Sequence, residues 1–313
     1  MHTISYQFSL KLPELLMIFI MEPKVFRLLS CIFLLFLLNP FLFFSHANSP
    51  LDFLKPLIGT QKGNTARGLS QLKKYLSDLG YISNNINANN PSDENDDFFD
   101  DNLELAIKKY QRFFKLSVNG VLDANTIAKL MKPRCGVPDF PNRIQFANTS
   151  SKFSFFPGEP KWPPTKTSLA YSFTRGTRPD VNQAILDATR LWSSVSPFRF
   201  VYVPEYNNCD IKITFEFRDH GDGLPFDGPG GILAHAFAPI DGRLHYDGDE
   251  MWRDGVFKGA YDMQTIGLHE LGHTLGLDHS TDDRAIMYPY FDIGSRKGLG
   301  QDDIDGIKAL YKF

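Results

Sequence analysis

The sequence of 313 residues has few cysteines, which gives little material for a disulfide framework. Its three cysteines are Cys31, Cys135 and Cys209, and Cys31 lies in a segment that we expect to be removed. Cys135 has another use, described below, so we expect no disulfide bond. The chain also lacks an excess of positive charge, since its formal net charge is −3 at pH 7. That balance argues against nucleic acid as a partner.

A hydrophobic run long enough to span a membrane is missing as well. Residues 28–44 form an apolar run of about 17 residues that Pro40 interrupts, whereas a spanning helix needs about 20. Basic residues precede this run, and residues 45–47 have the small-x-small pattern that signal peptidase reads. Residues 1–47 are therefore predicted to be a signal segment of a secreted, extracellular protein, in the apoplast or the extracellular matrix. A membrane anchor is the alternative.

The next part of the chain, residues 48–151, has apolar residues at helical spacing. This spacing predicts helices over residues 67–79 and 103–114. Asp123 has the character of an N-cap for a third helix that ends near Met131. These segments predict a compact three-helix module.

Residues 140–167 are rich in proline and are predicted to be a linker that proteases can reach. Asn148, followed by Thr and Ser, is an acceptor for N-glycosylation.

A different pattern begins in residues 152–313, which we expect to form a second domain. Strand-like alternation and helical periodicity occur together there, and this predicts layers of helices on a sheet. The predicted strands are 168–174, 198–203 and 211–217, and the predicted helices are 180–194, 262–275 and 301–311.

The strongest motif is His-Glu-Leu-Gly-His-Thr-Leu-Gly-Leu-Asp-His, which begins at His269. His269 and His273 are four residues apart on a predicted helix, so both imidazoles leave the same face. Gly276 allows a sharp turn that returns His279 as a third nitrogen ligand. Three protein ligands leave one position open, which is typical of a catalytic zinc. Glu270 is placed to act as general base on a zinc-bound water that attacks a peptide carbonyl.

The residues after this motif support the same interpretation. Ala285-Ile286-Met287-Tyr288-Pro289 places a methionine beneath the three histidines, in the manner of the metzincin Met-turn. The chain resembles the matrix metalloproteinases, in particular compact plant members without a haemopexin domain. The resemblance implies a zinc endopeptidase with a metzincin catalytic domain, an α/β (α+β) fold with a twisted mixed sheet and three helices. The helical module before it resembles a peptidoglycan-binding fold and is expected to be an inhibitory propeptide.

The segment Pro133-Arg134-Cys135-Gly136-Val137-Pro138-Asp139 resembles the cysteine switch of this family. A thiolate is a strong zinc ligand and would fill the open position, which keeps the precursor inactive. The resemblance implies that Arg134 pairs with Asp139 to hold the loop. An inert buried cysteine is the alternative.

The resemblance also implies a structural zinc and calcium. The implied ligands of the structural zinc are His220, Asp222, His235 and His245, and those of calcium are Asp227, Gly228, Gly230, Ile232, Asp247 and Glu250. Family members often carry a second calcium site, but Arg243 stands where that site has an aspartate. Asp210 and Asp241 remain as candidate ligands there.

Substrates of this family are peptides or proteins. Residues 231–237 are predicted to form an edge strand that binds an extended peptide by strand addition. The loop 289–300 would form one wall of a pocket that prefers an apolar side chain such as Leu, and the small Thr265 would leave that pocket deep. We expect a monomer, with proteinaceous inhibitors as further partners.

Two other classes of function remain open. One is an inactive binding protein, against which the intact Glu270 argues. The other is a cell-wall binding protein that uses the helical module.

Overall fold

The computed structural model describes residues 49–82, 96–140 and 152–313. The predicted signal segment, the glycosylation acceptor Asn148 and the activation region up to residue 151 lie outside these ranges. The described part of the chain has no helix with the length and apolarity of a membrane span. Cys135 and Cys209 are both free thiols.

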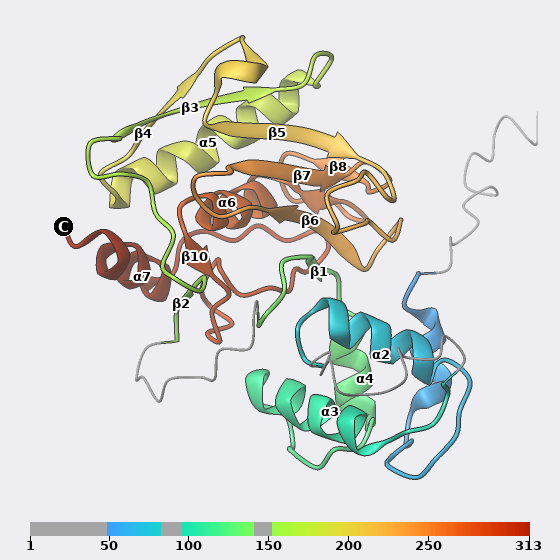
Figure 1. Ribbon diagram of the computed structural model, residues 1–313. Coiled ribbons are helices and arrows are strands. Elements are labelled where there is room, and N and C mark those ends of the chain that lie inside the picture. The colour runs from blue at the N-terminus through green and yellow to red at the C-terminus, as the bar shows by residue number, and fades with distance from the viewer. Residues whose placement is uncertain (1–48, 83–95, 141–151) are drawn as a thin grey trace, which may run out of the picture. The chain divides into compact units, whose positions relative to one another are not determined.

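The N-terminal part is helical, as predicted, and Figure 1 shows it in blue to green. The side chain of Asp100 caps the second helix by accepting from Leu103 N, and Asp123 caps the third by accepting from Thr126 N. The helix bounds are α2 Leu69–Asp78, α3 Asp101–Phe113 and α4 Ala124–Leu130, and a short 3-10 helix, η2, precedes them at Asp52–Leu57.

The C-terminal part is built on a mixed six-stranded sheet with the strand order β1-β6-β7-β5-β3-β4 (Figure 1). Strands β3, β4, β5 and β7 pair in parallel, and β6 runs antiparallel to β7. The bounds are β1 Arg134–Cys135, β3 Ser168–Phe173, β4 Arg199–Tyr202, β5 Ile211–Glu216, β6 Ile232–Ala236 and β7 Arg243–Asp247. Two small ribbons pair β2 Ser154–Phe155 with β10 Leu277–Asp278 and β8 Trp252–Arg253 with β9 Tyr261–Asp262.

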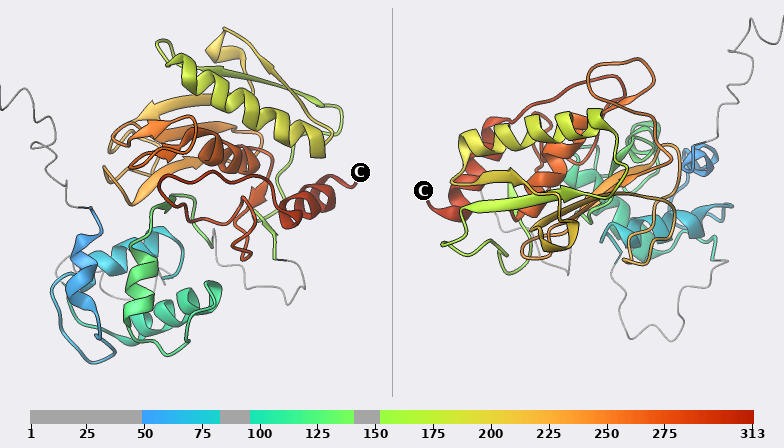
Figure 2. Two further views of the ribbon diagram at one scale, coloured as in Figure 1. Left: turned by 180° about the vertical axis from the view of Figure 1, so that it is seen from behind. Right: turned by 90° about the horizontal axis from the view of Figure 1, so that it is seen from above.

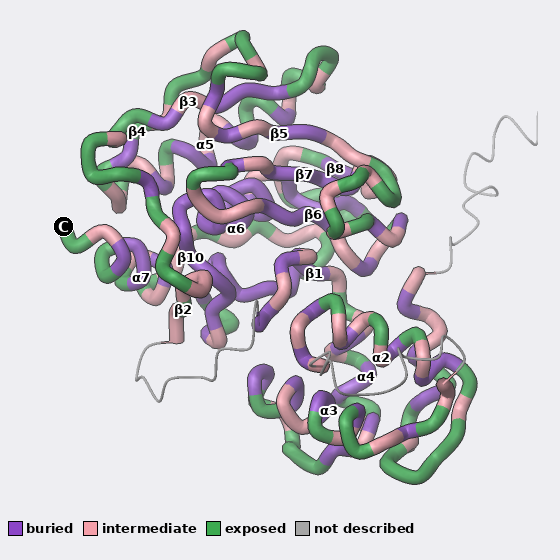
Figure 3. Tube along the Cα trace, in the orientation of Figure 1, coloured by how far each residue is buried: buried purple, intermediate pink, exposed green. Residues whose placement is uncertain are grey.

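Three helices complete this domain, which confirms the predicted fold class. They are α5 Pro179–Val195, α6 Met263–Thr274 and α7 Gln301–Tyr311. Helices α5 and α6 pack on the same face of the sheet, as Figure 2 shows from behind. Figure 3 shows that α6 is buried along almost its whole length, with only Gln264 less than fully buried. A helix in that position can carry ligands that solvent reaches from one side only.

Within residues 152–313, strand β6 lies at the edge of the sheet, as predicted. In the full chain, β1 of the N-terminal part pairs with that edge in parallel through Arg134–Ile232 and Cys135–Ala234. One prediction needs correction: the linker ends earlier than residue 167, because β2 pairs with β10 and Trp162 is buried. The proline-rich composition hid these contacts, which depend on residues more than 100 positions away.

Candidate active site

Helix α6 presents the first two histidines of the motif. It begins after Asp262, whose carboxylate accepts from Thr265 N at 3.1 Å and from its hydroxyl at 2.6 Å. His269 and His273 lie one turn apart on the buried helix, as the spacing predicted. The turn that follows needs Gly276, whose φ is 99° and whose Cβ, if present, would lie 2.3 Å from the Pro160 carbonyl oxygen.

Each of the three imidazoles has its Nδ1 atom against an oxygen that can only accept. His269 Nδ1 donates to Ile286 O at 2.7 Å, and His273 Nδ1 donates to Leu277 O at 2.8 Å. His279 Nδ1 lies 2.8 Å from Asp139 Oδ1. All three Nδ1 atoms therefore carry the hydrogen, and each Nε2 atom carries a free lone pair.

These lone pairs face one another, which fits a bound metal ion. The Nε2 atoms of His269 and His273 are 3.1 Å apart, and His279 Nε2 is buried without a hydrogen-bond partner among the described residues. Nitrogens that bind one tetrahedral zinc at about 2.0–2.1 Å would be separated by about 3.3 Å. Burial lowers the pKa of all three imidazoles, which favours the neutral form that a metal ligand needs.

Cys135 completes the cluster from the other side. Its Sγ lies 3.5 Å from His273 Nε2, and the four candidate ligand atoms all lie within 4.8 Å of one another. The pairing of β1 with β6 brings the cysteine there, and Val137 N donates to Sγ at 3.4 Å. Burial and the nearby Glu270 raise the pKa of the thiol. A zinc ion would reverse that tendency, because it binds the thiolate.

Glu270 is buried next to this cluster. Neither of its carboxyl oxygens makes a hydrogen bond of normal geometry with the described residues, and burial raises its pKa to about 8. Met287 lies beneath the helix, where its Sδ is 2.3 Å from the position of a Cβ on Gly272. Only glycine allows this close approach of the methionine to α6.

Arg134 and Asp139 form the buried pair that the resemblance implied. Arg134 Nη2 lies 2.6 Å from Asp139 Oδ1, and both side chains are fully buried. Tyr81 also donates to Asp139 Oδ2 at 2.6 Å. The sequence analysis missed Tyr81 and the contact between Asp139 and His279. No local pattern could have revealed either contact, since Tyr81 and Asp139 are 58 positions apart.

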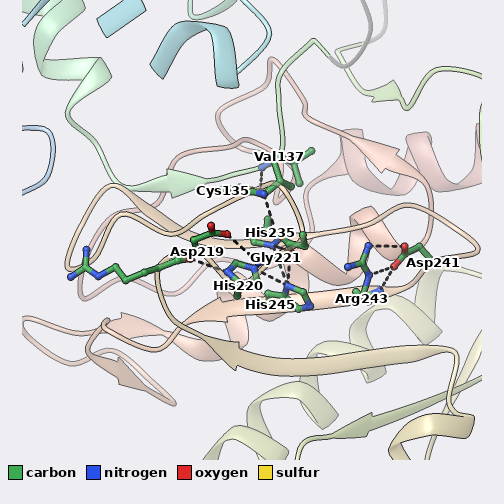
Figure 4. Close-up of polar contacts among 12 residues, drawn as sticks. Cys135, Val137, Asp219, His220, Gly221, His235, Asp241, Arg243 and His245 are labelled. Carbon is green, nitrogen blue, oxygen red and sulfur yellow. Dashed lines mark hydrogen bonds and ion pairs between the residues drawn. The ribbon is translucent and has the colours of Figure 1, made fainter. Parts of the chain in front are cut away.

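A second cluster joins the loop after β5 to strands β6 and β7, and Figure 4 shows three of its members, His220, His235 and His245, pointing toward one another. Asp222 Oδ2 lies 2.8–2.9 Å from a nitrogen of each histidine. Burial lowers the pKa of His245 to about 4. Among the described residues, this cluster and the first one are the two groups of potential ligands that come within 4.8 Å. Four converging ligands leave no open position, which fits a structural zinc.

The acidic residues of the predicted calcium site lie near one another but are less tightly gathered. Burial, together with the neighbouring carboxylates, raises the pKa of Asp227 to about 7 and that of Glu250 to about 8. Asp247 Oδ2 is buried without a partner. A cation would relieve this repulsion. The backbone N–H groups of Gly230 and Ile232 donate to the carboxylates of Glu250 and Asp227.

The proposed ligands of a second calcium are already paired. Arg243 binds Asp241 through Nε and Nη2 at 2.7 and 2.9 Å, as Figure 4 shows. Asp210 accepts from Ala170 N at 2.7 Å and pairs with Lys166 at 2.6 Å. Both carboxylates thus have cationic partners in the protein itself.

Comparisons with known proteins agree with this geometry. The family model "Matrixin" matches residues 161–312, and the model "Putative peptidoglycan binding domain" matches residues 65–130. Metalloendoproteinase 1 of Glycine max is 44% identical over 80% of this chain and 83% of its own length. Metalloendoproteinase 5-MMP of Arabidopsis thaliana is 38% identical over 91% of this chain and 86% of its own length.

Animal proteins are also similar to this chain, but over a smaller share of its length. Interstitial collagenase of Sus scrofa is 45% identical over 66% of this chain and 42% of its own length. The matched family models include no haemopexin domain. From the zinc-ligand motif, the mixed sheet and these relatives together, we conclude that the chain belongs to the matrixin family of zinc-dependent metalloendoproteinases.

Proposed function

We propose that this chain is the secreted precursor of a matrixin that hydrolyses peptide bonds in extracellular proteins once its propeptide is removed. Residues 48–151 are the inhibitory propeptide, and residues 152–313 are the catalytic domain. One observation carries the proposal. Three buried imidazoles direct their Nε2 atoms at one point, and the Cys135 thiol lies on the remaining side.

His269, His273 and His279 would hold the catalytic zinc, and Met287 would support them from below. Zinc bound there supplies Lewis acidity, which acidifies water and polarises the carbonyl of the substrate. Glu270 accepts the proton of the attacking water and delivers it to the leaving amine.

The precursor would be inactive because of the group that occupies the fourth coordination position of the zinc. In the precursor, the Cys135 thiolate replaces water, and β1 covers the edge of β6 where an extended substrate would pair. Removal of the propeptide frees both the metal position and the strand edge. The loop 289–300 would then line the pocket for an apolar side chain such as Leu.

The depth of this pocket depends on Thr265. Its hydroxyl donates to Asp262 and accepts from Lys297 N at 2.9 Å. Those bonds hold the loop against the helix.

Two further ion sites belong to the proposal. His220, Asp222, His235 and His245 would bind a structural zinc, and Asp227, Asp247 and Glu250 would bind at least one calcium ion. Asp210 accepts from Ala170 N and pairs with Lys166, which argues against it as a calcium ligand.

A cell-wall binding role for the helical module is the alternative. The module shares buried contacts with Tyr288 and Tyr290 of the C-terminal part, and this favours an inhibitory role.

The test combines metal analysis with a peptide-cleavage assay, before and after proteolytic removal of the propeptide. Two zinc ions per chain, and cleavage only after trimming, are expected. Cleavage of equal rate before trimming would contradict latency, and one zinc or none would contradict the proposed ligand sets. Binding of residues 48–140 to a glycan matrix would support the alternative.

A further inference from the structure

The three zinc-binding imidazoles differ in what holds their Nδ1 atoms. His269 and His273 donate to the carbonyl oxygens of Ile286 and Leu277, which belong to the catalytic domain. His279 donates instead to a carboxylate of the propeptide, that of Asp139, at 2.8 Å. The first two contacts survive activation unchanged, whereas the third must be lost when the propeptide leaves.

The carboxylate of Asp139 is rigidly held for this contact. Arg134 donates to Oδ1 at 2.6 Å and to Oδ2 at 3.0 Å, and Tyr81 donates to Oδ2 at 2.6 Å. The side chains of Asp139 and His279 are 0% and 1% exposed. Water therefore does not compete for the bond in the precursor.

Tyr81 also links this carboxylate to the helical module. Its ring packs edge-on against Tyr110 and Phe140, with ring centroids 5.3 and 5.1 Å away. The folded module thus fixes the position of Asp139, and through it the orientation of the imidazole of His279.

We propose that Asp139 is a positioning residue for the catalytic zinc, so that the propeptide helps to retain the metal as well as blocking it. The inference rests on the proposed zinc site. A carboxylate that accepts from the far nitrogen of a ligating imidazole fixes its tautomer and makes it a stronger ligand. Loss of such a partner typically weakens metal binding about 10–100-fold. The precursor therefore binds the catalytic zinc more tightly than the mature enzyme for two separate reasons, the thiolate of Cys135 and the carboxylate of Asp139.

The test separates these two reasons by the rate at which a colorimetric chelator removes zinc from the full chain. The background is Cys135→Ser, which removes the thiolate, in a chain that also carries Glu270→Ala so that the precursor does not cleave itself. It is compared with Cys135→Ser/Asp139→Asn in the same chain. Because the chain is proposed to hold two zinc ions, zinc release from the catalytic site must be identified. It is the kinetic phase that is missing in a His273→Ala variant. We expect release about 10–100-fold faster from the double variant. Equal rates in the two proteins would overturn the inference.

A measurement on the wild-type chain guards against a variant that fails to fold. The Nδ1–H proton of His279 should resonate downfield of those of His269 and His273, because it alone is bonded to a carboxylate. It should move further than the other two when the propeptide is removed, because only His279 loses its hydrogen-bond partner. A His279 resonance that stays in place would also overturn the inference. A wild-type chain without zinc at this site would instead overturn the proposed function.

Discussion

The hydroxyl oxygens of Tyr110 and Tyr290 lie 2.6 Å apart in a buried contact that joins helix α3 to the segment after Met287. Tyr110 is fully buried, and Tyr290 is 6% exposed. Phe114 packs on the Tyr290 ring at 5.0 Å, and Lys129 Nζ lies 4.3 Å from the centre of the same ring. This contact therefore contributes to the association of the N-terminal helical module with the C-terminal domain.

The two tyrosines should be energetically coupled. Tyr110→Phe leaves the Tyr290 hydroxyl without its partner, and we expect a loss of about 1–2 kcal/mol in the free energy of unfolding. The double variant with Tyr290→Phe should lose less than the sum of the two single variants, since no orphaned hydroxyl remains. Urea unfolding of the four proteins measures this cycle. Strictly additive losses would show that the hydroxyls do not interact.

Glu270 is predicted to contribute to the rate of peptide hydrolysis but not to the stability of the fold. Glu270→Ala should reduce peptide hydrolysis by the trimmed enzyme about 10²–10⁴-fold, the usual contribution of a general base. Because the buried carboxyl has no hydrogen bond of normal geometry, the precursor should unfold at the same or a higher urea concentration. Zinc content should be unchanged. Retained hydrolysis would contradict the assigned role.

Cys135 is predicted to control activation. Cys135→Ser replaces a strong zinc ligand with a weak one, so the precursor should convert itself to the mature form faster than wild type. Gel analysis of the purified precursor over time measures the conversion. Cys209→Ser is the matched control, because that thiol is bonded to the Tyr206 and Ile211 carbonyl oxygens, away from both histidine clusters. A Cys135→Ser precursor as stable as wild type would rule out the switch.

Arg296 should stabilise the start of α6 through Asp262. Its Nε and Nη2 donate to the Asp262 carboxylate at 2.9 and 2.7 Å. Arg296→Ala should lower the free energy of unfolding at pH 7 by about 1–2 kcal/mol, at the low end because the guanidinium is partly exposed. Arg284→Ala is the control, since Arg284 also pairs with an aspartate, Asp282, but is itself 79% exposed.

The effect of Arg296 should depend on pH in a defined direction. Although burial opposes it, bonding to Arg296 lowers the pKa of Asp262 below its ordinary value of about 3.9. A carboxyl whose folded pKa is depressed stabilises the protein above its unfolded pKa and stops doing so as pH falls through the folded value. The difference between wild type and Arg296→Ala should therefore shrink in urea titrations below about pH 4. A difference that is constant from pH 7 to pH 3 would contradict the ion pair.

The sequence predicted those features that depend on residues close together in the chain. The zinc motif has its histidines at helical spacing, so their place on one helix was predictable. Asp123 is a typical N-cap residue, so the start of the helix that follows it was predictable too. The strands β7, β8 and β9 were not predicted, because their glycine- and histidine-rich surroundings lack alternation. The contact between Asp139 and His279 spans 140 positions, so only the folded chain brings the two residues together. The metal cluster was predictable in composition, and its propeptide partner was not.

Two residues from outside the helical module complete its hydrophobic core. Tyr288 and Tyr290 of the catalytic domain are buried among the apolar side chains of η2, α2, α3 and α4. A propeptide that departs after cleavage leaves these two rings behind, and its own interior then has a gap. The detached fragment would therefore unfold more readily and rebind the active site less well. Activation would thus be effectively irreversible, because release itself destabilises the inhibitor.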